Sequence, residues 1–464
     1  MHFKQFYVGC LAHASYLIGD GGEAVVVDPS RDIEMYLAEA RAHALTIRWV
    51  LETHLHADFV SGHRELAAAT GATIGIGARA GAAYPHRALQ EGDEIRAGEV
   101  VLRALETPGH TPEHLSYLVF EHAGDAAPWG VLTGDTLFVG DVGRVDILSS
   151  RLPVAELAGL MYDSLHGKLL KLPNQTRVYP AHGAGSLCGK SIGRESWSTI
   201  GQQRMMNPAL REMTREAFVD EITRDVPETP VYFLHSRDMN QAGPALIAGR
   251  DLPPAVSPEA FAEAAAGGAT VLDTRPAGEY CRAHVGRSLH VGLDGQYASW
   301  VGTLAKPSDP LLLVTESGRE EEAVLRLTRV GYENVVGTLA GGFDAWTRAG
   351  LPVASMPSED VVGVVAAMAG ANPGARRSRG VLDVRRPGEW NDGHLEGAVH
   401  IPLSELPARA NELDPDRDWL VICASGYRSA MGASVLERAG FKRVANAEGG
   451  MDALRRAGKA IAGG

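Results

Sequence analysis

The sequence has few cysteines and no long apolar run. Only four cysteines occur in 464 residues (Cys10, Cys188, Cys281 and Cys423), and none form a CxxC pair. So few cysteines build no disulfide framework, which predicts a reducing cytoplasm and makes any special cysteine a reactive thiol. No apolar run reaches the roughly 18 residues of a membrane-spanning helix, and residues 1–30 lack the pattern of a secretion signal.

Positive charge is also scarce. Lys and Arg number 44 against 57 Asp and Glu, which gives a net charge of −13, and the basic residues form no cluster. This composition argues against nucleic acid and anionic membranes as partners. The length predicts about two or three domains.

The second half of the chain contains a copy of itself. The segment "VLDTRPAGEYCRAHVGRSLHVGL" begins at Val271, and "VLDVRRPGEWNDGHLEGAVHIPL" begins 110 positions later at Val381. A repeat of this length is a whole domain, and its alternation of apolar strands and helical stretches predicts two tandem α/β domains. Proline-rich linkers near residues 250 and 356 divide the chain into predicted domains at 1–250, 256–355 and 358–464.

One cysteine stands at the end of a predicted strand. Cys423 follows "WLVI" and opens the loop "CASGYRS" before a helical stretch. Backbone N–H groups of such a loop converge on the sulfur and stabilise both a thiolate and a bound anion, and Arg428 adds positive charge. We expect Cys423 and Arg428 to be catalytic, with Ser425, Gly426 and Ser429 binding the anionic substrate; the alternative is an inert buried cysteine.

This last domain resembles rhodanese, the sulfurtransferase family, in its Asp-x-Arg strand, its "GHLEGAVHIP" segment and its cysteine loop. The resemblance implies that Cys423 carries a sulfane sulfur as a persulfide. Arg428 comes five residues after Cys423, the shorter form of the loop, which favours sulfur over phosphate as the target. In the first copy Thr315 takes the cysteine position in the acidic segment "LVTESGREEEA", so residues 256–355 are expected to be a non-catalytic rhodanese-like domain for packing or docking.

Potential metal ligands are spread over the first 245 residues in four groups, each after a strand-like stretch. They are His54, His56 and Asp58 in "THLHAD", His110 and His114 in "TPGHTPEH", Asp135 in "LTGD", and His182 in "YPAH". Four such groups are hard to explain except by convergence on a metal at one sheet edge.

This pattern resembles the metallo-β-lactamase superfamily, whose fold is an αββα sandwich. Members with two metals use a His-x-His-x-Asp-His run, and here Phe59 replaces the last histidine; His63 is the nearest substitute. Two imidazoles and one carboxylate around a single metal leave open positions, as in non-haem Fe(II) oxygenases.

The segment "GDTLFVGDVGRVDI" resembles persulfide (sulfur) dioxygenases, a branch that uses one iron. The resemblance implies one Fe(II) per chain bound by His54, His110 and Asp135, with His56, Asp58 and His182 orienting the ligands or a bound water. Arg144 is a candidate for holding the anionic substrate, or else a structural ion pair with Asp146. Cys188 is a candidate for relaying sulfur, or else a small buried thiol.

The whole chain resembles fusions of a persulfide dioxygenase with two rhodanese units. This implies that a low-molecular-weight persulfide and O2 react to give sulfite and a thiol, and that Cys423 joins sulfane sulfur to sulfite as thiosulfate. The implied role is clearance of excess sulfide and persulfide, and a homo-oligomer is possible. The competing hypotheses are a zinc thioester hydrolase of the glyoxalase II type, a non-enzymatic sulfur carrier, and a flavodiiron-like oxidoreductase.

Overall fold

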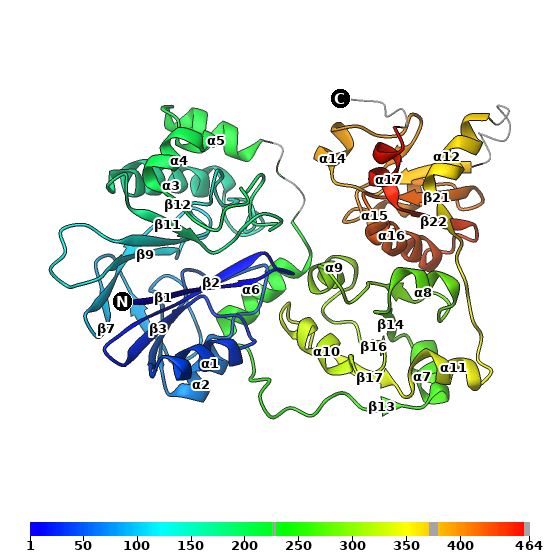
Figure 1. The fold of residues 1–464 in the computed structure, drawn as a ribbon, viewed down its shortest axis with the longest axis horizontal. Helices are drawn as coiled ribbons and strands as arrows, with labels where there is room; N and C mark the ends of the chain where they lie inside the picture. The colour runs from blue at the N-terminus through cyan, green and yellow to red at the C-terminus, as the bar shows by residue number, and fades with distance from the viewer. Residues whose placement is uncertain (225, 227–228, 371–378, 459–464) are drawn as a thin grey trace. The chain divides into compact units, whose positions relative to one another are not determined.

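The computed structural model describes residues 1–224, 226, 229–370 and 379–458 (Figure 1). Residue contacts divide the chain into two compact units, one of Met1–Arg250 with Thr328–Gly331 and one of Asp251–Leu327 with Tyr332–Gly464. Residues 371–378 and 459–464 of the predicted third domain lie outside the described part.

The first unit contains two six-stranded sheets. The first sheet has the order β1 (His2–Val8), β2 (His13–Asp20), β3 (Glu23–Val27), β4 (Thr46–Leu51), β5 (Thr73–Gly77), β6 (Arg87–Leu89). The second has the order β12 (Ser198–Thr199), β11 (Arg177–Pro180), β10 (Gly130–Gly134), β9 (Leu115–Phe120), β8 (Val100–Glu106), β7 (Glu94–Ala97). The helices are α1 (Glu34–Ala42), α2 (His63–Thr70), α3 (Val154–Gly167), α4 (Ile200–Met206), α5 (Arg215–Thr223) and α6 (Tyr232–Ala242).

Three apolar clusters define the layers of this unit. Alternate residues of β2 face opposite ways, as the two-residue period of a strand requires, so Tyr16 enters a core shared with the second sheet and Leu17 packs toward α1 and α2. A third cluster joins the outer face of β10 and β11 to α3, for example through Val131 and Met161. The layers are therefore helix, sheet, sheet and helix, which confirms the predicted αββα sandwich.

A hairpin forms at the turn "GDGG", residues 19–22. Gly21 and Gly22 adopt φ of 57° and 85° between β2 and β3, a conformation that side chains with a Cβ rarely adopt. The structure adds β1, which pairs antiparallel with β2 along its whole length.

The second unit contains two five-stranded parallel sheets of identical order. The first is β13 (Ala255–Val256), β17 (Val335–Leu339), β16 (Leu311–Val314), β14 (Thr270–Asp273), β15 (Leu289–His290). The second is β18 (Ser358–Asp360), β22 (Val444–Glu448), β21 (Asp418–Ile422), β19 (Arg379–Asp383), β20 (Val399–His400). The first repeat has α7 (Pro258–Ala266), α8 (Ala277–Arg282), α9 (Tyr297–Leu304), α10 (Glu320–Thr328) and α11 (Gly342–Arg348), and the second has α12 (Val361–Gly370), α14 (Pro387–Asn391), α15 (Leu406–Arg409), α16 (Tyr427–Arg438) and α17 (Gly450–Arg456). The shared order confirms two tandem domains of one fold.

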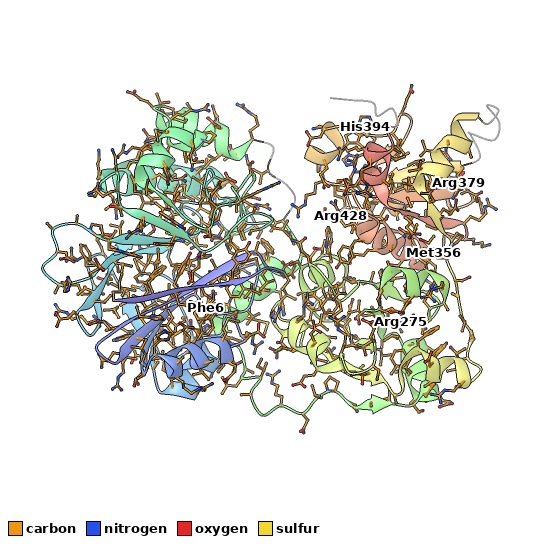
Figure 2. All side chains as sticks on the ribbon, viewed as in Figure 1. Phe6, Arg275, Met356, Arg379, His394 and Arg428 are labelled. Atoms are coloured by element: carbon orange, nitrogen blue, oxygen red, sulfur yellow. The ribbon has the colours of Figure 1, made fainter. Side chains whose placement is uncertain are left out.

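The Asp-x-Arg motif braces the end of one central strand in each sheet. Arg275 donates to both carboxylate oxygens of Asp273 at 2.6–3.2 Å, and Arg385 does the same to Asp383 at 2.7–3.0 Å (Figure 2). All four residues are buried, so each charge is compensated by its partner. The Asp-x-Arg motif, which makes the repeat recognisable in the sequence, therefore stabilises the fold of each domain.

Within the part of the chain that the structure describes, the helices are too short or too polar to cross a bilayer.

Candidate metal centre and thiol loop

The four predicted ligand groups follow the strands β4, β8, β10 and β11 of the first unit. From these loops His54, His110 and Asp135 each bring one ligand atom to a common point, all within 4.8 Å of one another. Nε2 of His54 lies 3.8 Å from Oδ2 of Asp135, and Nε2 of His110 lies 3.5 Å from the same oxygen. Metal bonds of roughly 2.1 Å place neighbouring donors about 3.0–3.5 Å apart, so the spacing is close to that of a coordinated ion.

Hydrogen bonds decide which nitrogen of each imidazole carries a lone pair. Thr53 donates its hydroxyl hydrogen to Asp28 at 2.8 Å, so its oxygen accepts from Nδ1 of His54 at 2.9 Å. Nδ1 of His110 donates to the carbonyl of Arg144 at 2.6 Å. In both rings Nε2 is therefore the unprotonated atom that faces Asp135.

The buried atoms at this point lack protein partners. Nε2 of His54 and Oδ2 of Asp135 are both buried without a hydrogen bond. Unpaired lone pairs in a buried place are costly unless a cation satisfies them. The three side chains thus fit a metal ion, with two imidazoles and one carboxylate as its ligands.

Asp28 supports the ligand loop and was not anticipated from the sequence. It ends the apolar strand β3 and accepts hydrogen bonds from the Thr53 backbone and hydroxyl at 2.7 and 2.8 Å. Nε2 of His56 lies 3.1 Å from Oδ1 of Asp28, the oxygen that also accepts from the Thr53 backbone. Burial by itself would raise the pKa of Asp28, but His56 and these hydrogen bonds lower it below its usual value. The same strand-end reasoning that selected the metal ligands applies to Asp28.

Two further buried residues near the site were not anticipated from the sequence. His13 donates from Nε2 to the Asp28 carbonyl at 2.8 Å, and burial lowers its pKa to about 4. Glu52 accepts from Ser61 at 2.6 Å, and burial raises its pKa to about 8. His13 is therefore neutral at pH 7, and Glu52 is mostly protonated.

A second group of potential ligands lies beside the first. Asp58, His182 and Cys188 each bring one ligand atom within 4.8 Å of the others. The Phe59 ring is fully buried, with its centroid 4.1 Å from that of His13 and 4.4 Å from that of His56. An aromatic ring supplies no metal ligand at this position, so the second group relies on the thiol of Cys188.

His63 does not replace the missing histidine. It begins α2, packs at a tilt against Tyr84 with ring centroids 4.7 Å apart, and faces Glu52 at 3.7 Å. Among the described residues it belongs to none of the ligand groups. The suggestion of His63 as a substitute ligand is therefore wrong, because its start-of-helix position points it elsewhere.

His182 connects the two groups through carboxylates. Its Nε2 lies 2.8 Å from Asp58 and its Nδ1 lies 2.7 Å from Asp135. Burial opposes a charged imidazole, but the two carboxylates raise the pKa of His182 well above its usual value. Burial likewise opposes ionised Asp135, yet His182 and His110 lower the pKa of Asp135. The two carboxylates therefore favour the charged form of His182, whose Nδ1 is hydrogen-bonded to Asp135.

The thiol of Cys188 is held in its neutral form. Cys188 is buried, and burial together with Asp58 and Asp135 raises its pKa well above the usual value. A bare thiolate is therefore disfavoured there, and a nearby cation would be needed to stabilise it.

Arg144 is paired. It is bonded to both carboxylate oxygens of Asp146 at 2.9 and 2.6 Å and donates to the Thr229 hydroxyl at 2.9 Å. This geometry matches the structural alternative, and a substrate role would require the ion pair to open.

One backbone N–H group of the Cys423 loop is directed at the sulfur. Cys423 directly follows β21, and the Gly426 N–H donates to its sulfur at 3.1 Å. The sulfur also lies 3.4 Å from the Ser429 hydroxyl, which donates to Asn446 at 2.6 Å. Gly426 has φ of 108°, which favours glycine and turns its N–H toward the sulfur before α16 begins.

Arg428 lies beside this loop in an ion pair. Its guanidinium donates to both carboxylate oxygens of Glu389 at 2.6 Å (Figure 2). Burial by itself would lower the pKa of Arg428, but Glu389 raises it, so the cation is retained. Ser425, by contrast, is exposed at the loop tip.

The corresponding loop of the first repeat has no thiol. Thr315 directly follows β16, as Cys423 follows β21. Glu316 and Glu322 there are paired with Arg319 at 3.1 and 2.9 Å. Ion pairs within the loop thus occupy the Arg319 guanidinium, which faces carboxylates of its own repeat and not a bound anionic ligand.

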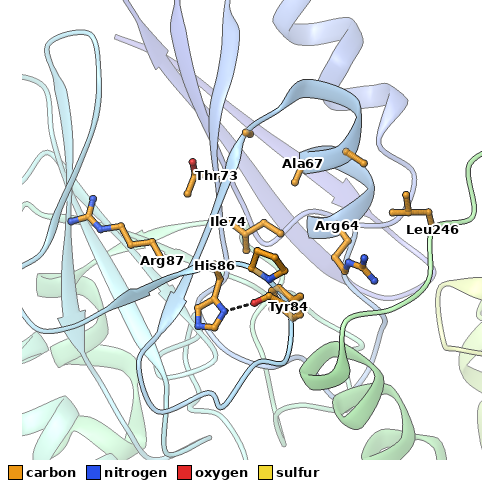
Figure 3. A pocket seen from close by; sticks show the side chains of 11 residues that line it. Arg64, Ala67, Thr73, Ile74, Tyr84, His86, Arg87 and Leu246 are labelled. Carbon is orange, nitrogen blue, oxygen red and sulfur yellow. Dashed lines mark hydrogen bonds between the residues drawn. The ribbon is translucent and has the colours of Figure 1, made fainter.

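A cavity of about 520 Å³ opens elsewhere on the first unit (Figure 3). It is lined by residues of α2, by residues 84–86 directly before β6, and by Leu246. Arg64 and Arg87 also line it. None of the predicted site residues lines it, so it is separate from the metal centre.

Comparisons with known proteins match both units. A model of the metallo-beta-lactamase superfamily matches residues 8–182, and a model of the rhodanese-like domain matches residues 257–349 and 365–457. A solved structure described as a metallo-beta-lactamase from Staphylococcus aureus is 33% identical, with a TM-score of 0.65, and the match covers 73% of this chain and 98% of that one.

Two curated relatives match the first unit. A mitochondrial persulfide dioxygenase of Homo sapiens is 28% identical over 223 residues, covering 47% of this chain and 78% of its own length. A hydroxyacylglutathione hydrolase of Rhodospirillum rubrum is 39% identical over 165 residues, covering 35% of this chain and 57% of its own length. The two relatives are named for different activities.

Proposed function

Because this chain belongs to the metallo-β-lactamase superfamily and continues into two rhodanese-like domains, we propose that it is a persulfide dioxygenase coupled to a sulfurtransferase. Its substrates are a low-molecular-weight persulfide, O2 and water, and its products are a thiol and sulfite, with thiosulfate formed in the second step. One observation carries the proposal: an open His–His–Asp metal site and a thiol loop suited to sulfur anions occur in one chain. The human persulfide dioxygenase among its relatives supports it.

In this proposal His54, His110 and Asp135 hold one Fe(II). The iron supplies coordination positions and electrons for the reaction of the outer persulfide sulfur with O2. The protein residues orient the metal ligands and neutralise the charge of the nearby carboxylates. Thr53 and the Arg144 carbonyl keep Nε2 of the two histidines available, and the His182 imidazolium balances the charge of Asp58 and Asp135.

The sulfur-transfer step uses Cys423. The persulfide Cys423–S–S⁻ transfers its outer sulfur to sulfite, so the S–S bond to the protein breaks, a new S–S bond forms thiosulfate, and Cys423 leaves as a thiolate. No outside oxidant or reductant is needed. The Gly426 N–H and the neighbouring Arg428 stabilise the negative charge that develops on the cysteine sulfur. Free thiols persist in a reducing cytoplasm, where we place this reaction.

Oxygen uptake tests the proposal directly. Anaerobically purified, iron-loaded protein is given a low-molecular-weight persulfide, and O2 consumption and metal content are measured on the same sample. We expect uptake with about one iron per chain, since one complete His–His–Asp set is present, and loss of uptake in His110→Ala. A Cys423→Ser variant should accumulate sulfite where the unmodified chain gives thiosulfate. Iron-loaded protein without uptake would overturn the proposal.

A second candidate is a zinc thioester hydrolase, and a specific observation favours it. The group of Asp58, His182 and Cys188 could hold a second metal beside the first, and a hydroxyacylglutathione hydrolase is among the relatives. This candidate predicts about two zinc ions per chain, hydrolysis of a hydroxyacylglutathione thioester and no O2 consumption. The same metal analysis and oxygen measurement separate the two candidates.

A further inference from the structure

The side chain of Tyr427 leaves its own domain and contacts the cysteine-less repeat within the second unit. Tyr427 is the first residue of α16, and its hydroxyl donates to the Gly292 carbonyl at 3.0 Å. Its ring packs on the loop that follows β15. A Cβ added at Gly292 would lie 3.3 Å from the ring, and one at Gly295 would lie 3.5 Å from it. Burial raises the pKa of Tyr427, so its hydroxyl remains a hydrogen-bond donor.

The receiving loop is itself tied to the sheet of the first repeat. Val291 and Leu293 donate backbone N–H groups to the carbonyls of Asp273 and Thr274 at 3.0 and 2.8 Å. Arg326 then donates to the carbonyls of Leu293 and Gly295 at 2.5 and 2.7 Å. A loop held on both sides is a rigid acceptor for Tyr427.

The catalytic loop is held by its own domain before and after Tyr427, because Arg428 is bonded to Glu389 and Ser429 donates to Asn446. The carbonyls of Cys423 and Ala424 accept from the N–H groups of Met451 and Asp452 at 2.8 and 2.9 Å, at the start of α17. The other end of the loop is Gly426, whose N–H points at the sulfur, and Tyr427 comes next in the chain. Tyr427 is the direct neighbour of Gly426, so its bond to Gly292 adds a hold from the other repeat to the contacts that position this N–H.

We infer that Tyr427 is a positioning residue for Cys423, and that the cysteine-less repeat serves sulfur transfer by holding Tyr427 through the Gly292 carbonyl and the loop at residues 291–296. This inference rests on the proposed sulfur transfer at Cys423. It gives the degenerate repeat a task that needs no thiol of its own, since Thr315 takes no part in it.

The same helix face offers matched controls. Ser434 of α16 accepts from the His290 N–H at 3.0 Å, and Glu437 is bonded to His284 at 2.9 Å. Both contacts join the same two repeats, but they lie two to three helical turns from the loop. Removing one of them weakens the interface and leaves the Gly426 N–H in place.

The test compares Tyr427→Phe, Gly292→Ala and Ser434→Ala in the full chain. The first readout is the pH dependence of iodoacetamide alkylation at Cys423, quantified by mass spectrometry on the peptide from Asp418 to Arg428 of the reduced protein. The second is kcat and KM for thiosulfate:cyanide sulfur transfer. Losing one hydrogen bond corresponds to roughly a two- to tenfold effect. Tyr427→Phe removes the hydroxyl, and the Cβ of Gly292→Ala would press on the ring from 3.3 Å. Both variants should move the alkylation midpoint up by about 0.3 to one pH unit and lower kcat by a similar factor, with KM less affected.

Ser434→Ala should keep both readouts near those of the unmodified chain. The inference is overturned if Tyr427→Phe leaves the alkylation midpoint unchanged, or if Ser434→Ala shifts it equally, since that would reflect general loosening of the interface. If the unmodified chain transfers no sulfur, the proposed function fails while the alkylation profile still decides the role of Tyr427.

Discussion

Replacing Asp28 with asparagine tests whether the metal ligands are held in place from behind. Asp28 is 1% exposed and accepts two hydrogen bonds from Thr53, whose hydroxyl in turn orients His54. Asparagine has the same shape but loses the charge, and its amide nitrogen cannot accept from Thr53. His54 would then lose the contact that keeps its Nε2 unprotonated and aimed at the site.

The size of the effect follows from these contacts. Hydrogen bonds to a buried charge contribute roughly 1.5–3 kcal/mol each, and changing a residue that orients a metal ligand costs about 10–100-fold in metal affinity. We therefore expect Asp28→Asn to weaken Fe(II) binding by about 10–100-fold, or roughly 1.4–2.8 kcal/mol. Anaerobic titration with Fe(II) against a competing chelator measures it.

Glu113→Gln is the matched control. Glu113 is also buried and also holds the ligand loop, since it accepts from the Leu55 N–H at 3.1 Å, but no described contact of its side chain reaches a predicted ligand. This variant should lose thermal stability and keep its Fe(II) affinity within about threefold, well below the effect of a ligand-orienting residue. Equal affinities for Asp28→Asn and the unmodified chain would refute the reasoning.

Three further predictions concern residues outside the predicted ligands. Burial lowers the pKa of His63 to about 3 from 6.5, so its neutral form stabilises the fold above pH 6.5, and this stability is lost as the pH falls toward 3, at about 1.4 kcal/mol per pH unit. The melting temperature of His63→Gln should fall less steeply than that of the unmodified chain as the pH is lowered over this range. Parallel plots of melting temperature against pH would contradict this pKa for His63. Thr315→Ala should leave thiosulfate:cyanide turnover unchanged, and lost turnover with an intact fold would show that the first repeat acts chemically. Cys188 should alkylate about tenfold or more slowly than Cys423 at pH 7.5 in the metal-free protein, because its thiolate is destabilised; equal rates by peptide mass spectrometry would count against this.

The fold was largely predictable because its signals are local. The apolar strands of the repeats are continuous runs, such as "TVLD" and "RGVLD", and they occur where the structure places β14 and β19. The repeat is visible because its braced Asp-x-Arg motif recurs at one offset. The strand β1 was missed because its exposed residues, Lys4 and Tyr7, fall on opposite faces, so the sequence shows no two-residue alternation.

The candidate metal site was predictable as a set of residues. Side chains that follow strands meet at a sheet edge, so His54, His110 and Asp135 could be grouped from their positions alone. The residues that support these ligands could not all be identified from their positions in the sequence. Asp28 and Glu52 each directly follow a strand and carry the same strand-end signal, whereas His13 begins β2 and its position shows nothing about its contacts.

The sequence by itself determined the elements, the tandem repeat and the two substitutions, Phe59 and Thr315, that direct the functional reading. Each of these depends on residue type and on short-range pattern, which the order of residues contains in full. Only the tertiary structure decided the partners. It brought Cys188 to Asp58, paired Arg428 with Glu389, and placed Tyr427 against Gly292, 135 positions away. Hydrogen bonds and ion pairs act over a few ångströms in space, so spacing along the chain carries no record of which buried charge or donor meets which.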